Sequence, residues 1–284
     1  MSGDLRQALE DGGLFARKSL GQHFLLDLNL TAKIARTAGI IAGETVIEIG
    51  PGPGGLTQAL LESAAAKIIV IEKDARFVTH LKHFFADHLD RLVVLEADAL
   101  IIDESALMAE HGGAGPARIV ANLPYNVGTP MLVKWLKAGP WRGPMCLMFQ
   151  EEVAERIVAR PGSDHYGRLA VLTAARATAR IAMNVPRMAF TPPPRVESAI
   201  VIIEDRSNNF EDLAGLEHVT AQAFGQRRKM LRASLRGLGD AEALLAAAGI
   251  DPTARPETVP PEGFFALVRA WRATNRTGHV NRAI

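Results

Sequence analysis

The sequence predicts an α/β fold with a mostly parallel central sheet, followed by a small C-terminal all-helical domain. Short runs rich in β-branched residues alternate with amphipathic stretches from about residue 28 to residue 204. These runs are mostly apolar throughout, which is typical of strands that helices cover on both faces. Beyond Asp205 the pattern changes to helical stretches separated by glycine and proline.

Five apolar runs are expected to form the parallel strands, because helical stretches separate them and imply right-handed crossovers. The runs are Thr45–Gly50, Lys67–Glu72, Leu92–Asp98, Arg118–Leu123 and Met145–Gln150. The helical stretches include Leu56–Ser63, Ala75–Phe85 and Met131–Lys137. Two further runs, Arg180–Val185 and Glu197–Glu204, are joined by a proline-rich loop without a helix. They indicate an antiparallel hairpin at one edge of the sheet.

We expect an N-terminal arm at residues 1–20, a sheet domain at residues 21–204 and a helical domain at residues 205–284. The expected helices of the last domain are Phe210–Gly225, Met230–Leu238, Ala241–Ala248 and Pro261–Asn275. The sequence shows no internal repeat and no low-complexity tract, which makes a solenoid unexpected.

The composition excludes several classes of protein. A hydrophobic fraction of 48% over 284 residues provides a packed core and excludes intrinsic disorder. The single cysteine, Cys146, excludes an internal disulfide and a cysteine-rich metal site. No stretch approaches the ~18 apolar residues of a membrane span, and no signal peptide is visible. We expect a cytoplasmic, monomeric protein that binds neither a membrane nor a metal.

A glycine-rich turn after the first predicted strand of the sheet is the sharpest local feature. Gly50, Gly52 and Gly55 fit the pattern G-x-G-x-x-G between a strand and a helix. Glycines allow a tight turn there and let the backbone approach a ligand at the helix N-terminus. Glu72 ends the next strand, where a carboxylate can hold both hydroxyls of a ribose. Together these residues indicate a nucleotide-like cofactor.

Two prolines in this turn favour S-adenosylmethionine over a dinucleotide. Pro51 and Pro53 have no N–H to donate to a pyrophosphate, and S-adenosylmethionine has no phosphate. Asp98, after the third strand, is expected to reach the adenine amino group. Glu48 is costly to bury without a partner, so it meets either the cationic ligand or a structural hydrogen bond. The expected sheet is therefore that of a Rossmann-like, S-adenosylmethionine-dependent methyltransferase.

The tetrapeptide Asn122-Leu-Pro-Tyr follows the fourth strand and can activate an adenine amino group. The lone pair of that group is delocalised into the ring, which makes it a poor nucleophile. The Asn122 side-chain oxygen and the carbonyl of Leu123 or Pro124 can accept its two N–H bonds and push the nitrogen toward a tetrahedral geometry. Tyr125 can stack on a base taken out of its helix. In isolation, such a loop is ordinarily a plain turn.

A basic segment in the helical domain is a candidate RNA-binding surface. Residues 225–236 contain five basic residues and no acidic one. Arg228, Arg232 and Arg236 are spaced at i, i+4 and i+8, so that one face of a helix would carry them. Such a stripe suits an RNA backbone, although a merely solvated charged face is the common alternative.

Six motifs in this order make the chain resemble the small-subunit ribosomal RNA adenine dimethyltransferase family. They are residues 18–25, Val46–Gly55, residues 70–74, Glu96–Asp98, Asn122–Asn126 and residues 190–196. Relatives of the same fold include erythromycin-resistance methylases and mitochondrial transcription factors. The motifs extend from about residue 17 to residue 200, and the helical tail fits the second domain of the family.

This resemblance implies a role for each motif. The cofactor-binding residues would be His23, Leu25, Gly50, Gly52, Glu72, Asp98 and Asn122. The catalytic residues would be Asn122, Leu123, Pro124, Tyr125 and Phe190, with the target adenine between Tyr125 and Phe190. His23 departs from the Asn that is often found there, so a helix-entry residue without a ligand remains an alternative. For Phe190 we expect an exposed stacking platform beside the rigid Pro192–Pro194, and core packing is the alternative.

The function implied by the resemblance is methyl transfer from S-adenosylmethionine to two adjacent adenosines near the 3′ end of small-subunit rRNA. The product would be dimethyladenosines, and the partner the small ribosomal subunit. Three alternatives remain open. They are a large-subunit methylase of the resistance type, an RNA-binding factor without turnover, and a nicotinamide-dependent oxidoreductase. Intact Asn122, Pro124 and Tyr125 argue against loss of turnover.

Overall fold

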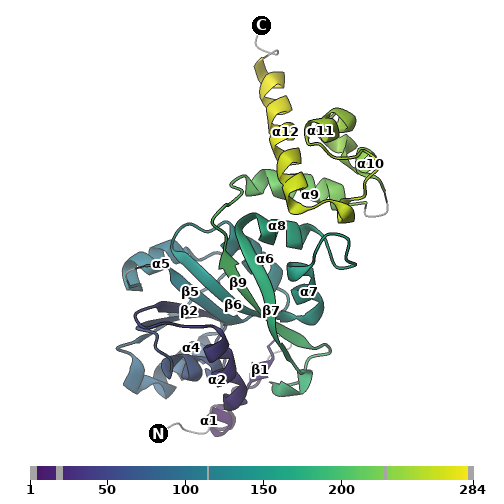
Figure 1. The fold of residues 1–284 in the computed structure, drawn as a ribbon. Helices are drawn as coiled ribbons and strands as arrows, with labels where there is room; N and C mark the ends of the chain where they lie inside the picture. Colours follow the sequence, from purple (N-terminus) through teal and green to yellow (C-terminus); the bar gives the residue numbers. More distant parts are fainter. Residues whose placement is uncertain (1–4, 17–21, 114, 227–228, 281–284) are drawn as a thin grey trace. The chain divides into compact units, whose positions relative to one another are not determined.

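The computed structural model describes residues 5–16, 22–113, 115–226 and 229–280. Contacts within the chain divide it into two compact units (Figure 1). The first unit consists of Met1–Ala154 and Arg180–Glu204, and the second of Glu155–Ala179 and Asp205–Ile284. Residues 155–179, which we expected in the sheet domain, therefore group with the helical domain.

The central sheet has seven strands in the order β4-β3-β2-β5-β6-β9-β7. Their bounds are β2 Thr45–Ile49, β3 Lys67–Glu72, β4 Leu92–Glu96, β5 Ala117–Asn122, β6 Arg142–Gln150, β7 Ala177–Val185 and β9 Ser198–Asp205. The pairs from β4 to β6 are parallel, and β9 runs antiparallel to β6. The predicted parallel sheet is confirmed, and the last two strands lie next to each other at one edge.

A second sheet, which the sequence did not predict, has only two short strands. β1 (Phe24–Leu25) pairs antiparallel with β8 (Phe190–Thr191), and Leu25 lies opposite Phe190. The pairing joins the segment before the first helix of the sheet domain to the proline-rich loop near residue 190. Two motifs that are far apart in the sequence thus come together.

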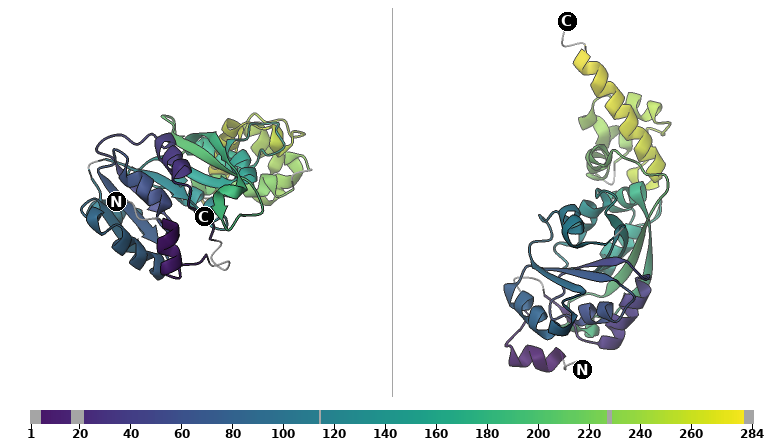
Figure 2. Two further views of the ribbon diagram at one scale, coloured as in Figure 1. Left: turned by 90° about the horizontal axis from the view of Figure 1, so that it is seen from below. Right: turned by 90° about the vertical axis from the view of Figure 1, so that its left-hand side faces the viewer.

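Helices cover both faces of the central sheet (Figure 2). All five residues of β2 are buried, which requires cover on both sides. The helices of this unit are α1 Leu5–Asp11, α2 Leu28–Thr37, α3 Gly55–Leu61, α4 Ala75–Phe84, α5 Glu104–His111, α6 Gly128–Leu136 and α7 Glu151–Val158, the last of which runs into the second unit. Apolar side chains of α2, α3 and α4 pack with the strands in one continuous core cluster. Asp27, Asp74 and Asp103 cap α2, α4 and α5 by accepting backbone N–H bonds.

The helical unit packs around a group of aromatic side chains. Its helices are α8 Arg168–Arg176, α9 Leu213–Phe224, α10 Leu231–Ser234, α11 Ala241–Ala247 and α12 Pro261–Val280. α8 packs against α9 and α12, which explains why residues 155–179 belong to this unit. The buried Tyr166 ring contacts Phe224, and its hydroxyl donates to the Val259 carbonyl at 2.9 Å. None of the helices in the described ranges is long and apolar enough to cross a membrane.

The helix expected at Met230–Leu238 is wrong in its extent. The α-helix covers only Leu231–Ser234, and a 3-10 turn continues to Leu238. Met230 has an extended backbone, so the helix starts after Arg228. Glycines at 237 and 239 do not favour a longer helix. The i, i+4, i+8 stripe therefore has no single helix to carry it.

Glu48 is a buried carboxyl group in the central strand β2. Its side chain is 1% exposed and accepts a hydrogen bond from the Thr57 hydroxyl at 2.7 Å. Burial raises the pKa of Glu48 to about 8, the Thr57 hydrogen bond opposes this, and the nearby Glu72 adds to it. Of the two alternatives for Glu48, the structural hydrogen bond is present. The raised pKa favours the protonated form of Glu48 at neutral pH.

We predict that Glu48→Gln makes stability less dependent on pH. The folded protein keeps a proton that the unfolded chain releases above its ordinary pKa of 4.5. Each pH unit between about 4.5 and 8 therefore removes up to about 1.4 kcal/mol from the free energy of unfolding. Glutamine cannot release that proton, so the variant should gain stability over the wild type as pH rises through this window. Urea denaturation at several pH values measures the difference, with the exposed Glu96→Gln as the control.

Candidate active site

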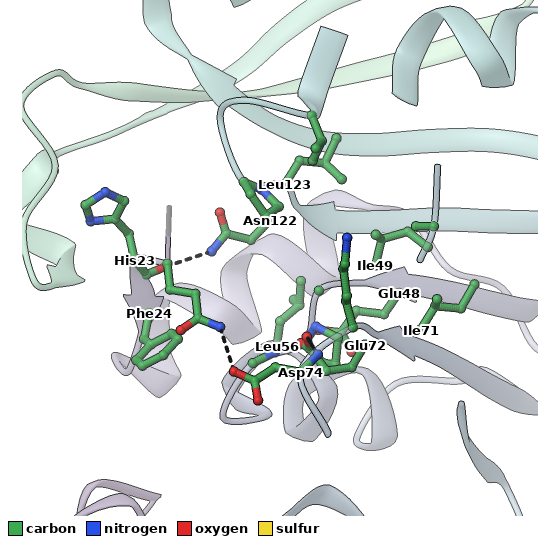
Figure 3. A pocket seen from close by; sticks show the side chains of 18 of the residues that line it. His23, Phe24, Glu48, Ile49, Leu56, Ile71, Glu72, Asp74, Asn122 and Leu123 are labelled. Carbon is green, nitrogen blue, oxygen red and sulfur yellow. Dashed lines mark hydrogen bonds between the residues drawn. The ribbon is translucent and has the colours of Figure 1, made fainter. Parts of the chain in front are cut away.

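The carboxyl ends of the parallel strands meet at one edge of the sheet and border a cavity of about 350 Å³ (Figure 3). The loops after β2, β3, β4 and β5 form its walls, and β1 with Phe190 closes it from another side. The expected cofactor-binding and catalytic residues all line this cavity. They are His23, Leu25, Gly50, Gly52, Glu72, Asp98, Asn122, Leu123, Pro124, Tyr125 and Phe190. The fold thus brings together residues from six separate segments.

The glycine turn needs glycine for two different reasons. Gly50 and Gly52 have backbone φ angles of +64° and +51°, which L side chains rarely adopt. At Gly55, the first residue of α3, a side-chain carbon would lie 2.5 Å from the carbonyl oxygen of Leu25. The first two glycines allow the turn at the cavity, and the third lets the helix pack against β1.

Glu72 connects this turn to the next one. Its Oε2 accepts a hydrogen bond from the Gly52 N–H at 3.1 Å, and its Oε1 accepts one from the Asp74 N–H at 2.8 Å. Burial raises the pKa of Glu72, and these backbone N–H bonds oppose the rise. A carboxylate offers about four acceptor positions, so Glu72 can accept further bonds from two hydroxyl groups. It therefore fits the ribose role that the sequence predicts for it.

Asp98 lies in the loop after β4, and a lysine holds it in the ionised form. Its Oδ2 accepts a hydrogen bond from Lys73 Nζ at 2.7 Å, and its Oδ1 accepts one from the Leu100 N–H at 3.0 Å. Lys73 lowers the pKa of Asp98. An ionised carboxylate is a strong acceptor for an amino group. The adenine role predicted for Asp98 therefore requires that the adenine share this carboxylate with Lys73.

Asn122 and Tyr125 lie in the loop that follows β5. Asn122 Nδ2 donates to the His23 carbonyl at a long 3.5 Å (Figure 3), which leaves its side-chain oxygen available as an acceptor. The half-buried Tyr125 hydroxyl is 2.7 Å from Ser198 Oγ, and burial raises the pKa of Tyr125. A side-chain carbon on Gly50 would lie 3.7 Å from Pro124. The predicted cofactor turn and the predicted target-base loop therefore lie close together and line the same cavity.

The exposed platform expected at Phe190 is wrong. Phe190 is 2% exposed and belongs to the core cluster, because β8 pairs with β1 and sets it opposite Leu25. Its ring borders the cavity from the core, so a base can meet it only inside the cavity. Core packing, the alternative for this residue, is what the structure shows.

His23 lies at the rim of the cavity and contacts two other motifs. Its Nδ1 is 2.7 Å from the Pro192 carbonyl oxygen, and its ring stacks on Tyr125 with centroids 5.8 Å apart. Asp27 caps the following helix, so His23 is not needed as a helix-entry residue. The role in cofactor binding stays a prediction.

Sequence reasoning missed a buried cluster that ties the Asp98 loop to α6. Lys134 on α6 donates hydrogen bonds to the carbonyls of Ala99 and Ile102, both at 2.7 Å, and pairs with Glu104 at 2.8 Å. The indole N–H of the fully buried Trp135 donates to the same carboxylate at 3.1 Å. Lys134 is the one charged residue of α6, and that isolated charge is the signal that could have revealed it.

Two of the predicted RNA-binding arginines, Arg232 and Arg236, belong to the second unit and are not among the residues that line this cavity. Arg228 falls outside the described residues. Arg232 and Arg236 are exposed, whereas Leu231 and Leu235, which each precede one of them, are fully buried. In the described part of the chain, no group of three His, Cys, Asp or Glu side chains could hold a metal ion.

Comparisons with known proteins agree on one family. The family model of ribosomal RNA adenine dimethylases matches residues 13–272. The chain is 57% identical to the ribosomal RNA small subunit methyltransferase A of Phenylobacterium zucineum, over 95% of this chain and 93% of that protein. The protein of the same name from Mesorhizobium japonicum is 54% identical, over 94% and 97% of the two chains.

Two solved structures are similar along most of their length. A dimethyladenosine transferase from Plasmodium falciparum has a TM-score of 0.75 and 25% identity, over 89% of this chain and 98% of that one. The 23S rRNA methyltransferase ErmE has a TM-score of 0.64 and 28% identity, over 88% and 99%. The family expected from the motifs is confirmed: the chain belongs to the ribosomal RNA adenine dimethylases.

Proposed function

We infer that the protein transfers methyl groups from S-adenosylmethionine to the exocyclic amino nitrogens of two adjacent adenosines near the 3′ end of small-subunit rRNA. The products are dimethyladenosines, formed while the small subunit matures. The observation that carries this inference is one cavity that both the Asn122–Tyr125 loop and the Gly50 turn line. The relatives named small subunit methyltransferase A support the choice of rRNA. We further propose that the protein acts as a monomer, in the cytoplasm, on the small subunit.

The cavity fits S-adenosylmethionine in its chemistry. Glu72 offers acceptors for the ribose, Asp98 offers one for the adenine amino group, and the backbone at Gly50 and Gly52 leaves room for the methionine part. His23 and Leu25 line the same cavity from β1 and the residue before it. When bound, this cofactor supplies a methyl group on a positively charged sulfur.

Asn122 and the turn that follows it make the target nitrogen nucleophilic. The Asn122 side-chain oxygen and a backbone carbonyl of Leu123 or Pro124 accept the two N–H bonds of the adenine amino group. The nitrogen lone pair is then less conjugated with the purine ring and can act as a nucleophile. No strong base is required to deprotonate the amino group beforehand. Tyr125 stacks on the base, and its bond to Ser198 fixes the orientation of the ring. Holding the reacting atoms in place supplies most of the rate enhancement.

One other candidate has an observation in its favour. The similarity to the 23S rRNA methyltransferase ErmE agrees with a large-subunit methylase of the resistance type. The similarity to proteins named small subunit methyltransferase A is much higher, at 57% and 54% identity. We therefore prefer the small subunit.

The decisive experiment identifies the modified nucleoside. The protein is incubated with labelled S-adenosylmethionine and immature small subunits, and the rRNA is digested and mapped. We expect dimethyladenosine at two adjacent positions near the 3′ end. Asn122→Ala should lower kcat at least about 100-fold while cofactor affinity stays within a few fold. Asn208→Ala, an exposed amide in the second unit, is the control. Label in large-subunit rRNA, or in none, contradicts the proposal.

Lys134 is predicted to position the cofactor loop. Lys134→Met removes a cation that holds two carbonyls of the Asp98 loop and the Glu104 carboxylate at the start of α5, so the KM for S-adenosylmethionine should rise about 10-fold. We expect kcat to change less than about threefold, and Lys134→Arg to restore most of the affinity for S-adenosylmethionine. Steady-state kinetics measures KM and kcat separately, with the exposed Lys82→Met as the matched control. A lower melting temperature without any change in KM would assign Lys134 a purely structural role.

The exposed arginines of the second unit are predicted to contact the RNA backbone. Replacing Arg232 and Arg236 with Glu, alone and together with Arg228, should weaken rRNA binding and flatten its salt dependence. The reason is that each lost phosphate contact lowers the slope by about 0.9 for a duplex. Filter binding over a salt series measures both effects. Cofactor affinity should stay constant, and Arg36→Glu on α2 controls for a general change of charge. Unaltered binding of rRNA would contradict the assignment.

A further inference from the structure

A second, larger cavity lies beside the first one. Its volume is about 1060 Å³, and it shares Gln22, His23, Phe24 and Tyr125 with the first cavity. The N-terminal segment around Phe15 forms one wall, and the proline-rich segment from Thr191 to Val196 forms the other. The roles assigned so far to the cofactor and the target base use only the first cavity.

A stacked pair of rings lies where the two cavities meet. His23 stacks on Tyr125 with an angle of 29° between the rings. Each ring is tied to the segment that carries Thr191–Val196 and the start of β9: His23 bonds to the Pro192 carbonyl, and Tyr125 to Ser198. The aromatic pair is thus a shared wall of the two cavities.

The walls of the second cavity have the chemistry of a nucleobase site. Leu14 is buried in a cluster with Leu9, Phe24 and Phe77, and this anchors the segment that holds Phe15. Phe15 itself is 69% exposed, and Val196 on the opposite wall is 44% exposed. Apolar and aromatic side chains that line a cavity are typical of sites for organic ligands. An aromatic ring is also the usual platform for an unstacked base.

Charged groups at the rim suit the linkage between two nucleotides. Arg195 is exposed and lines the cavity, and its guanidinium can meet a phosphate in two places at once. Glu10 also lines this cavity, and Arg195 is the basic residue that the proline-rich segment contributes to it. A ligand with an apolar face and a single negative charge beside it matches this arrangement.

We propose that the second cavity holds the base of the neighbouring adenosine while its partner occupies the first cavity. The proposal rests on the proposed function, in which the two target adenosines are adjacent. A single phosphodiester linkage joins them, so the second base must lie near the first, and the second cavity is the space that adjoins it. Phe15 stacks on the waiting base, and Arg195 meets the connecting phosphate.

The test combines a change in the protein with a change in the RNA. Small subunits are assembled from unmodified rRNA transcripts, with either the natural pair of adenosines or one of the pair replaced by uridine. The readout is kcat/KM for methylation of the other adenosine. For the wild type, we expect uridine to lower kcat/KM about 10-fold, because it stacks less strongly. For Phe15→Ala, we expect a similar loss with the natural pair and almost no further loss with uridine.

Controls separate this proposal from the one on which it rests. Phe15→Tyr keeps a stacking ring and should behave as the wild type, and Ile41→Ala, another exposed apolar side chain at 63%, should have no effect. Equal uridine penalties in the wild type and Phe15→Ala would overturn the second-cavity assignment alone. Absence of any methylation of the natural pair by the wild type would instead overturn the proposed function.

Discussion

The bond pattern of one carboxylate, that of Glu72, determines the geometry of the whole site. Its two oxygens bind the N–H of Gly52 and of Asp74, which belong to the turns after β2 and β3. Because Gly52 has a positive φ, its N–H does not take part in the hydrogen-bond ladder of the sheet. A buried N–H without an acceptor is costly. The Glu72 carboxylate accepts that N–H and so fixes the conformation of the glycine turn. Because α3 begins directly after this turn, its starting position is fixed as well. Close packing of Gly55 on Leu25 then sets the position of β1.

Two sets of contacts outside the main sheet complete the cavity. On one side, the pairing of β1 with β8 brings His23 and the proline-rich segment to the rim. On the other side, Lys134 binds the loop after β4 to the helix that begins after the Asn122–Tyr125 loop. Neither set of contacts belongs to the parallel ladder. The parallel sheet brings the loops to one edge. The contacts of β1 with β8 and of Lys134 with the loop after β4 then determine how far apart these loops lie.

Sequence patterns predicted the strands whose burial shows in their own residues. They missed the pairing of short segments that are far apart in the sequence. The residues Lys67–Glu72 form β3 as expected, because a strand buried on both faces is apolar throughout. β1 and β8 have two residues each and show no periodicity, so nothing in the sequence indicated their pairing. The exposure of Phe190 was wrong for the same reason, since the neighbouring prolines carried no information about Leu25. The spacing of the three arginines suggested one helix. Because the backbone at Met230 is extended, the helix begins only at Leu231 and cannot include Arg228.

The charges in the cavity are arranged for a reaction in which a cation loses its charge. Methyl transfer from a positively charged sulfur to a neutral amine spreads the charge in the transition state. An ionised carboxylate buried against the sulfur would stabilise the reactant more than the transition state, and would slow the transfer. Burial raises the pKa of Glu48, the most deeply buried carboxyl group of the cavity, to about 8, which favours its protonated form at neutral pH. Two carboxylates of the cavity have a lowered pKa, and each is paired with a cation: Asp98 with Lys73 at the partly exposed rim, and Asp74 with Arg76. The part of the cavity around Glu48 can thus bind the cofactor by shape and hydrogen bonds without trapping its charge.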